Sequence, residues 1–138
     1  MINLIVGVKG TGKTKRLIDD VNKAVSASHG VVVCVEYGKK LTYDVKYQVR
    51  LIDAKDYNIK DGKRLYGFIC GILAGNYDVT ELFIDSALKI CQDDMDSFVE
   101  FMEMLAPVVD EYHLHCVVTA SMPAEELPRQ LGKYIGNE

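Results

Sequence analysis

The segment LIVGVKGTGKTKRLI, residues 4–18, constrains the fold of this 138-residue chain more than any other. It opens with strand-forming residues, and after its glycines the apolar residues recur at helical spacing. The two parts are joined by Gly7, four further residues, and then Gly12, Lys13 and Thr14. This spacing, G-x-x-x-x-G-K-[ST], predicts a strand, a glycine-rich loop and a helix in immediate succession.

The residue types of this loop suit the binding of phosphate groups. Glycines allow backbone conformations in which successive N–H groups surround an anion, and the N-terminus of the following helix adds its dipole. Lys13 would contact the phosphates as a point charge, and the hydroxyl of Thr14 would bind Mg²⁺. We therefore expect a nucleotide to bind at eight loop residues: Gly7, Lys9, Gly10, Thr11, Gly12, Lys13, Thr14 and Lys15.

Buried strands and amphipathic helices alternate along the rest of the chain, which predicts an α/β fold. Further strands are expected at residues 31–36, 81–86 and 114–121, with a short one around 49–52. Further helices are expected at residues 63–75, from Asp93 or Asp94 onward, and from Pro123 onward, the last one containing Arg129. Together they predict a three-layer sandwich around a mostly parallel sheet of four to five strands.

Two helical stretches carry more detailed expectations. The core-facing residues of the helix after Asp94 should be Phe98, Phe101, Met102, Leu105 and Val109. In the helix at 63–75, three glycines at intervals of four residues, Gly67, Gly71 and Gly75, make a flat groove. Packing onto the sheet explains that groove at least as well as a dimer contact does.

The carboxyl ends of the expected strands bring polar residues to one edge of the sheet. In parallel α/β sheets the ligand site lies at these ends, where Gly7, Glu36, Asp85 and Ser121 fall. Asp85 ends a hydrophobic strand, so its carboxylate would hold Mg²⁺ directly or through water. The expected metal ligands are therefore Thr14 and Asp85.

Length, cysteine content and hydropathy add general expectations. The chain is long enough for one domain, residues 1–138, with a single core. Its four cysteines are never closer than 21 positions in the sequence, which excludes a C-x-x-C metal or redox pair. We expect them to be buried and to pack as small hydrophobic side chains. No signal peptide or membrane-spanning stretch is visible, and we expect a cytoplasmic protein without a membrane partner.

Charge is unevenly distributed along the sequence. The formal net charge of −4 makes general nucleic-acid binding an unfavoured, though not an excluded, interpretation. Residues 36–64 carry eight Lys/Arg and five Asp/Glu, whereas residues 76–112 carry one and ten. We expect a basic side that includes the glycine loop and an acidic side. The acidic stretch is either a solvated surface or a docking surface for a basic partner.

These motifs together resemble those of the P-loop NTPases, and within them the RecA-like branch. GVKGTGKT matches the first nucleotide motif, Walker A, and LFIDSAL is similar to the Walker B motif of that branch. VVCVEYGK places Glu36 like the glutamate that activates the attacking water in RecA-like ATPases. The resemblance implies that Glu36 and Lys13 are catalytic and that Thr119 or Ser121 senses the γ-phosphate.

The resemblance also implies a sheet order. The strand ending at Glu36 should lie next to the Asp85 strand, followed by the Thr119 strand and the Gly7 strand. Only 17 residues follow Ser121. Either GKYIGNE supplies a short last strand, or the Gly7 strand forms a sheet edge that a partner subunit could cover.

In size and motif layout the chain also resembles short bacterial P-loop proteins sometimes labelled twitching-motility ATPases. Pilus-retraction ATPases have an amino-terminal sensory domain and histidine and aspartate boxes that this sequence lacks. That function is therefore not carried over.

The leading functional expectation is a small Mg²⁺-dependent ATP-binding protein that acts as a slow ATPase (nucleoside-triphosphate hydrolase). One alternative is a small-molecule kinase for a nucleoside or another metabolite, although no arginine cluster suggests its lid. Another alternative is a non-hydrolysing switch in which ATP orders the basic segment 37–62 for docking to a partner. A homo-oligomer or a protein partner is compatible with each of these functions.

Overall fold

Five parallel strands form one sheet in the order β1-β5-β4-β2-β3 in the computed structural model, which describes residues 1–137. The strands are β1 (Ile2–Gly7), β2 (Val31–Glu36), β3 (Arg50–Asp53), β4 (Val79–Ile84) and β5 (His115–Ser121). The α/β class and the expected order of the four main strands are confirmed. The short strand expected around 49–52 is β3, which pairs with β2 at the edge of the sheet.

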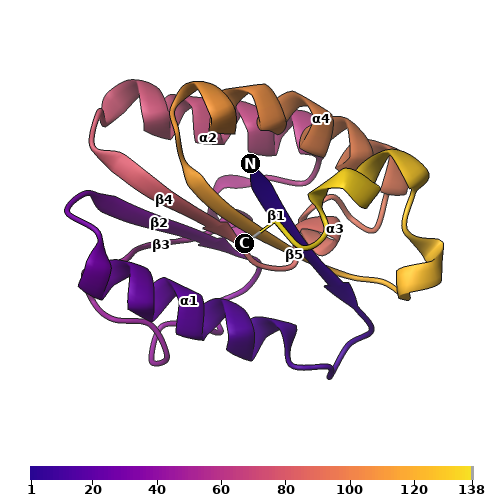
Figure 1. Ribbon diagram of the computed structural model, residues 1–138, viewed down its shortest axis with the longest axis horizontal. Helices are drawn as coiled ribbons and strands as arrows, with labels where there is room; N and C mark the ends of the chain where they lie inside the picture. The colour runs from indigo at the N-terminus through magenta and orange to yellow at the C-terminus, as the bar shows by residue number, and fades with distance from the viewer. Residues whose placement is uncertain (138) are drawn as a thin grey trace.

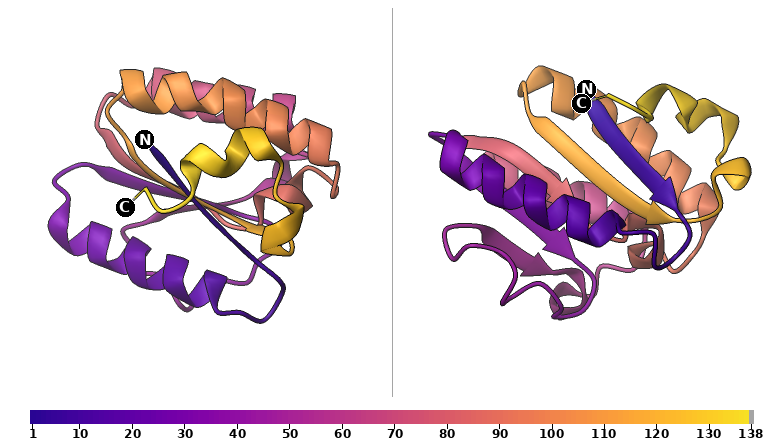
Figure 2. Two further views of the ribbon diagram at one scale, coloured as in Figure 1. Left: turned by 45° about the vertical axis from the view of Figure 1, so that its right-hand side comes forward. Right: turned by 60° about the horizontal axis from the view of Figure 1, so that its bottom comes forward.

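Helices cover both faces of the sheet (Figure 1). Helix α1 (Lys13–Ala27) lies on one face, and α2 (Gly62–Gly75) and α4 (Met95–Glu111) lie on the other, so Figure 2 shows three layers. The short elements are α3 (Ala87–Ile90) and the 3₁₀ turns η1 (Ala54–Tyr57), η2 (Ala124–Glu126) and η3 (Arg129–Tyr134).

The sheet separates two hydrophobic clusters. Leu17 and Val21 of α1 pack with one set of strand side chains, and the larger cluster joins the other set to α2 and α4. Consecutive strand residues such as Val32 and Val33 are both buried because each face of the sheet is covered. This explains why the strands read as uninterrupted apolar runs in the sequence.

Helices α2 and α4 each have an aspartate side chain that caps the helix N-terminus. The Asp94 carboxylate accepts a hydrogen bond from the backbone N–H of Ser97 (3.2 Å), which confirms Asp94 as the cap of α4. Asp61 caps α2 in the same way through the N–H of Arg64 (2.8 Å). The expected core residues of α4 are all buried: Phe98, Phe101, Met102, Leu105 and Val109.

The prediction of a helix from Pro123 onward is wrong. The chain forms two separate 3₁₀ turns there, η2 and η3, and Arg129 begins the second. Pro128 explains the interruption, because a proline disfavours helical conformation in the residue before it and lacks an N–H. Leu131 and Tyr134 of η3 are buried in the larger cluster, so tertiary packing holds this segment together with 3₁₀ hydrogen bonds such as that from the Leu131 N–H to the Pro128 carbonyl (3.0 Å).

The C-terminal segment partly covers the free edge of β1, as Figure 2 shows. Ile135 forms an isolated parallel bridge with Leu4, and the amide of Asn137 donates a hydrogen bond to the Ile2 carbonyl (3.2 Å). Within residues 1–137 this contact is a single bridge and not a full strand. The expectation that GKYIGNE supplies a short last strand beside β1 is therefore met only in part.

The three glycines of α2 do not pack onto the sheet. Gly67, Gly71 and Gly75 are exposed, and a Cβ atom added to any of them would meet no atom within 4 Å. The first of the two explanations for this groove, packing onto the sheet, is therefore wrong, because Leu65, Ile69 and Leu73 supply the buried face of α2 instead.

Three of the four cysteines are buried as expected. Burial raises the pKa of Cys91 to about 11 and that of Cys116 to about 12, and it raises the pKa of Cys34 further. Cys70 on α2 is half-buried. Within residues 1–137, every helix is too short or too polar to cross a membrane.

Candidate functional site

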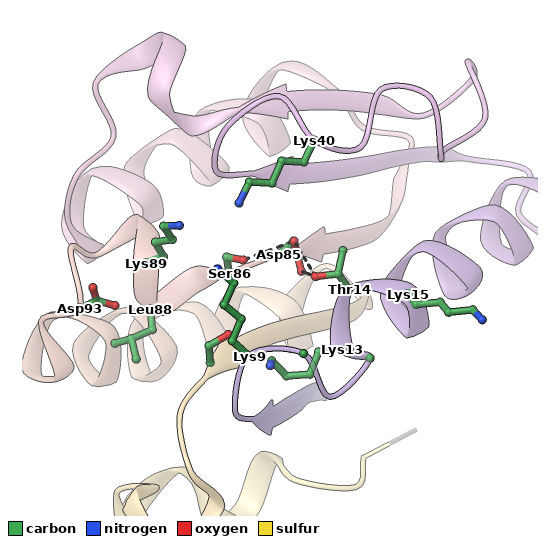
Figure 3. Close-up of a pocket in the computed structure, with 13 residues that line it drawn as sticks. Lys9, Lys13, Thr14, Lys15, Lys40, Asp85, Ser86, Leu88, Lys89 and Asp93 are labelled. Atoms are coloured by element: carbon green, nitrogen blue, oxygen red, sulfur yellow. Dashed lines mark hydrogen bonds between the residues drawn. The ribbon is translucent and has the colours of Figure 1, made fainter.

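A cavity of about 620 Å³ lies at the carboxyl ends of β1, β4 and β5 (Figure 3). One side is formed by the loop between β1 and α1, and the others by residues that follow β2, β4 and β5. The lining residues are Lys9, Gly10, Gly12, Lys13, Thr14, Lys15, Lys40, Asp85, Ser86, Leu88, Lys89, Asp93 and Ser121. Six of the eight expected loop residues line it, and the other two, Gly7 and Thr11, do not.

The loop between β1 and α1 depends on its glycines. Gly10 and Gly12 both have φ near +88°, in the left-handed region that other residues rarely adopt. Gly7 is required for a different reason: a Cβ atom there would lie 2.8 Å from the hydroxyl of Thr11. That hydroxyl donates a hydrogen bond to the Val8 carbonyl (2.8 Å) and so closes the loop on itself.

Helix α1 begins at this loop without a side-chain cap. Its N-cap residue is Gly12, which makes no side-chain hydrogen bond, whereas α2 and α4 are capped by aspartates. The first N–H groups of a helix need an external partner, and the helix dipole favours an anion there. Lys13, Thr14 and Lys15 of this first turn line the cavity. The cavity is therefore suited to a phosphate or carboxylate group.

Lys13 is held close to its own loop. Its ammonium group donates a hydrogen bond to the Val8 carbonyl (2.9 Å). Burial lowers the pKa of Lys13 from its usual value, and the nearby Asp85 carboxylate opposes that shift. An anion in the cavity would stabilise the charged form of Lys13 and compete with Val8 for it.

Asp85 connects the loop side of the cavity to β5. It is 5% exposed, and its Oδ1 accepts a hydrogen bond from the hydroxyl of Thr119 (2.7 Å). The hydroxyl of Thr14 lies 3.3 and 3.4 Å from the two carboxylate oxygens. Thr14 and Asp85, which are 71 positions apart in the sequence, therefore lie close together. They are the two metal ligands expected from the sequence.

These two residues fit a magnesium ion bound together with phosphates. Mg²⁺ prefers oxygen ligands and usually takes one or two carboxylates, with substrate phosphates and water completing its shell. Thr14 and Asp85 offer a hydroxyl and a carboxylate at the cavity surface. Within residues 1–137 no group of three or more His, Cys, Asp and Glu side chains could form an all-protein metal site.

The two candidates for the phosphate sensor occupy different positions. Ser121 lines the cavity. Thr119 is 1% exposed and does not line the cavity, and its hydroxyl also accepts a hydrogen bond from the N–H of Ser86 (2.8 Å). Ser86 itself has φ +59°, a left-handed conformation uncommon for serine. Thr119 thus orients Asp85 and the turn after β4, a role that the sequence analysis did not anticipate.

Glu36 is not among the lining residues, although it contacts one of them, Lys40. Its side chain is 2% exposed, and its Oε1 accepts hydrogen bonds from the backbone N–H groups of Lys40 (2.8 Å) and Leu41 (3.1 Å). It therefore anchors the loop that follows β2. The structure brings Lys13, Thr14 and Asp85 together at the cavity, whereas the buried Glu36 carboxylate does not line it.

Five lining residues were not anticipated from the sequence: Lys40, Ser86, Leu88, Lys89 and Asp93. Lys40 follows Glu36 by four positions, and Lys89 follows Asp85 by four. Both lysines therefore lie just beyond the carboxyl ends of adjacent strands, β2 and β4. That position relative to the strand ends was the only signal in the sequence that could have found them.

Comparison with known proteins assigns no family to the chain. No family model matches it, and no curated protein gives a significant match. The site is therefore interpreted from its own residues and geometry.

Proposed function

We propose that the chain binds ATP with Mg²⁺ in this cavity and hydrolyses it slowly, as a small P-loop NTPase of the RecA-like kind. The observation that carries the proposal is the meeting of an uncapped helix N-terminus, Lys13, Thr14 and Asp85 at one cavity. The sheet order, in which β5 separates β1 from β4, supports the RecA-like assignment. The arrangement adds Asp85, which lies outside the loop motif, to the residues of that motif.

The loop side of the cavity would bind the phosphates. Backbone N–H groups at the start of α1 and the ammonium of Lys13 would contact the phosphate oxygens. The hydrogen bond of Lys13 to Val8 would be exchanged for one to a phosphate, which is a charge-assisted bond and therefore stronger. Ser121, which lines the cavity, would donate its hydroxyl to the terminal phosphate.

Thr14 and Asp85 would hold magnesium. When bound, the ion would neutralise charge on the phosphate oxygens as the terminal phosphate leaves. The chain contributes by orienting Asp85: Thr119 donates to its Oδ1, and Thr119 is held in turn by the N–H of Ser86. This preorganisation fixes the carboxylate before any ligand arrives.

Glu36 is proposed to activate the attacking water by accepting its proton. This role requires the carboxylate to reach the cavity from its buried position. Oε1 is engaged by Lys40 and Leu41, so Oε2 is the oxygen proposed to take the proton. The role rests on the resemblance of VVCVEYGK to the segment that carries the water-activating glutamate of RecA-like ATPases.

Phosphate release from ATP tests the proposal, with two aspartates of the cavity as a matched pair. Asp85→Asn should lower Mg²⁺-dependent turnover by roughly a hundredfold or more, because it removes the metal-binding charge. Asp93→Asn should change turnover by less than about threefold, because Asp93 is exposed and asparagine tolerates its left-handed φ of +59°. Equal turnover in wild type and Asp85→Asn would contradict the proposal.

A further inference from the structure

The cavity has a second group of cations that the glycine-loop motif does not include. Lys40 comes from the loop after β2, and Lys89 comes from α3. In Figure 3 both side chains lie on the side of Asp85 and Ser86 that is away from Lys13. We call Lys40 and Lys89 the lysine wall.

The charges of the lysine wall are not neutralised by the protein. Within residues 1–137, no carboxylate oxygen lies within 4.0 Å of either ammonium group. The neighbouring Lys39 behaves differently, because it forms ion pairs with Asp53 (3.3 Å) and Asp56 (2.6 Å). Lys89 instead lies 5.7 Å from the ring centroid of Tyr37, a contact that leaves its charge available.

The backbone that carries Lys40 is fixed by two buried carboxylates. Glu36 accepts the N–H of Lys40 itself, and Asp53 accepts the N–H of Gly38 (2.8 Å). These carboxylates are 2% and 8% exposed. Gly38 has φ +87°, which only glycine adopts readily. Lys40 is therefore presented to the cavity from an anchored loop.

The cavity as a whole carries an excess of positive charge. Its lining includes five lysines and two aspartates, an excess of three positive charges, in a chain whose formal net charge is −4. Three of the lysines, Lys9, Lys13 and Lys15, belong to the glycine loop. The lysine wall supplies the other two, so a second set of anionic oxygens is expected to face it.

The position of the lysine wall indicates which anionic group of the ligand faces it. If Lys13 and α1 hold the phosphates on the loop side, the terminal phosphate would lie nearest to Thr14 and Asp85, the residues that would hold the metal. The lysine wall begins beyond Asp85 and Ser86. Its ammonium groups therefore face the end of the phosphate chain rather than its beginning.

We propose that Lys40 and Lys89 bind the terminal phosphate of the nucleoside triphosphate, so that this chain distinguishes triphosphate from diphosphate with its own lysines. The inference rests on the proposed nucleotide function and deepens it. It also means that the charge often supplied to a terminal phosphate by a partner's arginine is supplied here from within the chain.

Calorimetric titration of ATP and ADP, each with Mg²⁺ at low ionic strength, tests this inference. The double variant Lys40→Gln/Lys89→Gln should bind ATP about tenfold to hundredfold more weakly, and ADP should change by less than about threefold. Both side chains are exposed, so the variant should fold normally. Lys55→Gln is the matched control, because Lys55 also lies over Tyr37 (4.8 Å) but does not line the cavity.

The other outcomes separate this inference from the function on which it rests. Equal losses for ATP and ADP would overturn it, because the lysines would then contact a part that the two nucleotides share. Unchanged affinities for both would also overturn it and would be expected if the lysine wall held the phosphate of a second substrate. If the wild type bound neither ATP nor ADP, both the proposed function and this inference would be wrong. If the wild type bound them but the double variant showed no specific loss of ATP affinity, only the inference would be wrong.

Discussion

The two sides of the cavity are built in different ways. The glycine loop is one continuous segment, residues 9–15, whereas the facing side combines Lys40, residues 85–93 and Ser121 from three separate parts of the chain. The first is determined by local backbone conformation and by the start of α1. The second exists only because the sheet places the ends of β2, β4 and β5 side by side. A contiguous site can therefore be recognised from a short motif, and an assembled one requires the topology.

Glu36, which anchors the backbone of Lys40 on the assembled side, is the substitution with the largest expected effect. Glu36→Gln should retain ATP binding, because the amide oxygen can still accept the N–H groups of Lys40 and Leu41. Turnover should fall by roughly a hundredfold or more if the carboxylate takes a proton from water. Phosphate release and calorimetric titration on the same preparation measure the two effects separately.

The control for Glu36 is the other carboxylate that anchors the same loop. Asp53→Asn keeps an acceptor for Gly38 and Lys55, so turnover should change by less than about threefold. If Glu36→Gln turned over ATP as fast as wild type, Glu36 would have only the anchoring role that the structure shows.

Removing the hydroxyl of Thr119 should weaken the assembled side without touching the glycine loop. Thr119→Val leaves Asp85 without its shortest hydrogen bond and the N–H of Ser86 without its acceptor. The free energy of unfolding should fall by about 1–3 kcal/mol, measured by denaturant titration. Thr42→Val on the exposed loop should change it by less than about 0.5 kcal/mol. Equal stability of the two variants would show that Thr119 does not hold Asp85.

Alanine at two glycines should have opposite effects on stability. A Cβ atom at Gly12 or Gly67 would meet no atom within 4 Å, so crowding is absent at both positions. Gly12→Ala should lower the free energy of unfolding by about 1 kcal/mol, because φ +88° is unfavourable for alanine. Gly67→Ala, inside α2, should raise it by roughly 0.5–1 kcal/mol. An unchanged or raised free energy of unfolding for Gly12→Ala would contradict the left-handed conformation of Gly12, and a lowered one for Gly67→Ala would contradict the open helical position of Gly67.

Sequence reasoning succeeded where a feature depends on neighbouring residues. The strand, loop and helix around Gly12, a cap at Asp93 or Asp94 and the buried face of α4 each follow from local spacing, and the structure contains all three, with Asp94 as the cap. It failed after Pro123, where the effect of Pro128 on the helix was overlooked and two 3₁₀ turns form instead.

The assembled side was predicted only in part. Asp85 and Ser121 were found because strand ends share one edge of a parallel sheet. The link from Thr119 to Asp85 was missed because it depends on the register of β4 and β5, in which Ile84 pairs with Val118. The lysine wall was missed because neither Lys40 nor Lys89 belongs to a motif.

Calorimetric titration of ATP and GTP, each with and without magnesium, into wild type and Lys13→Ala tests the central claim most directly. We expect wild type to bind a nucleotide in a magnesium-dependent way and Lys13→Ala to lose that binding, because Lys13 is the cation of the loop placed against both the helix N-terminus and Asp85. Absence of binding to wild type, or equal binding by Lys13→Ala, would contradict the assignment of this cavity as a nucleotide site.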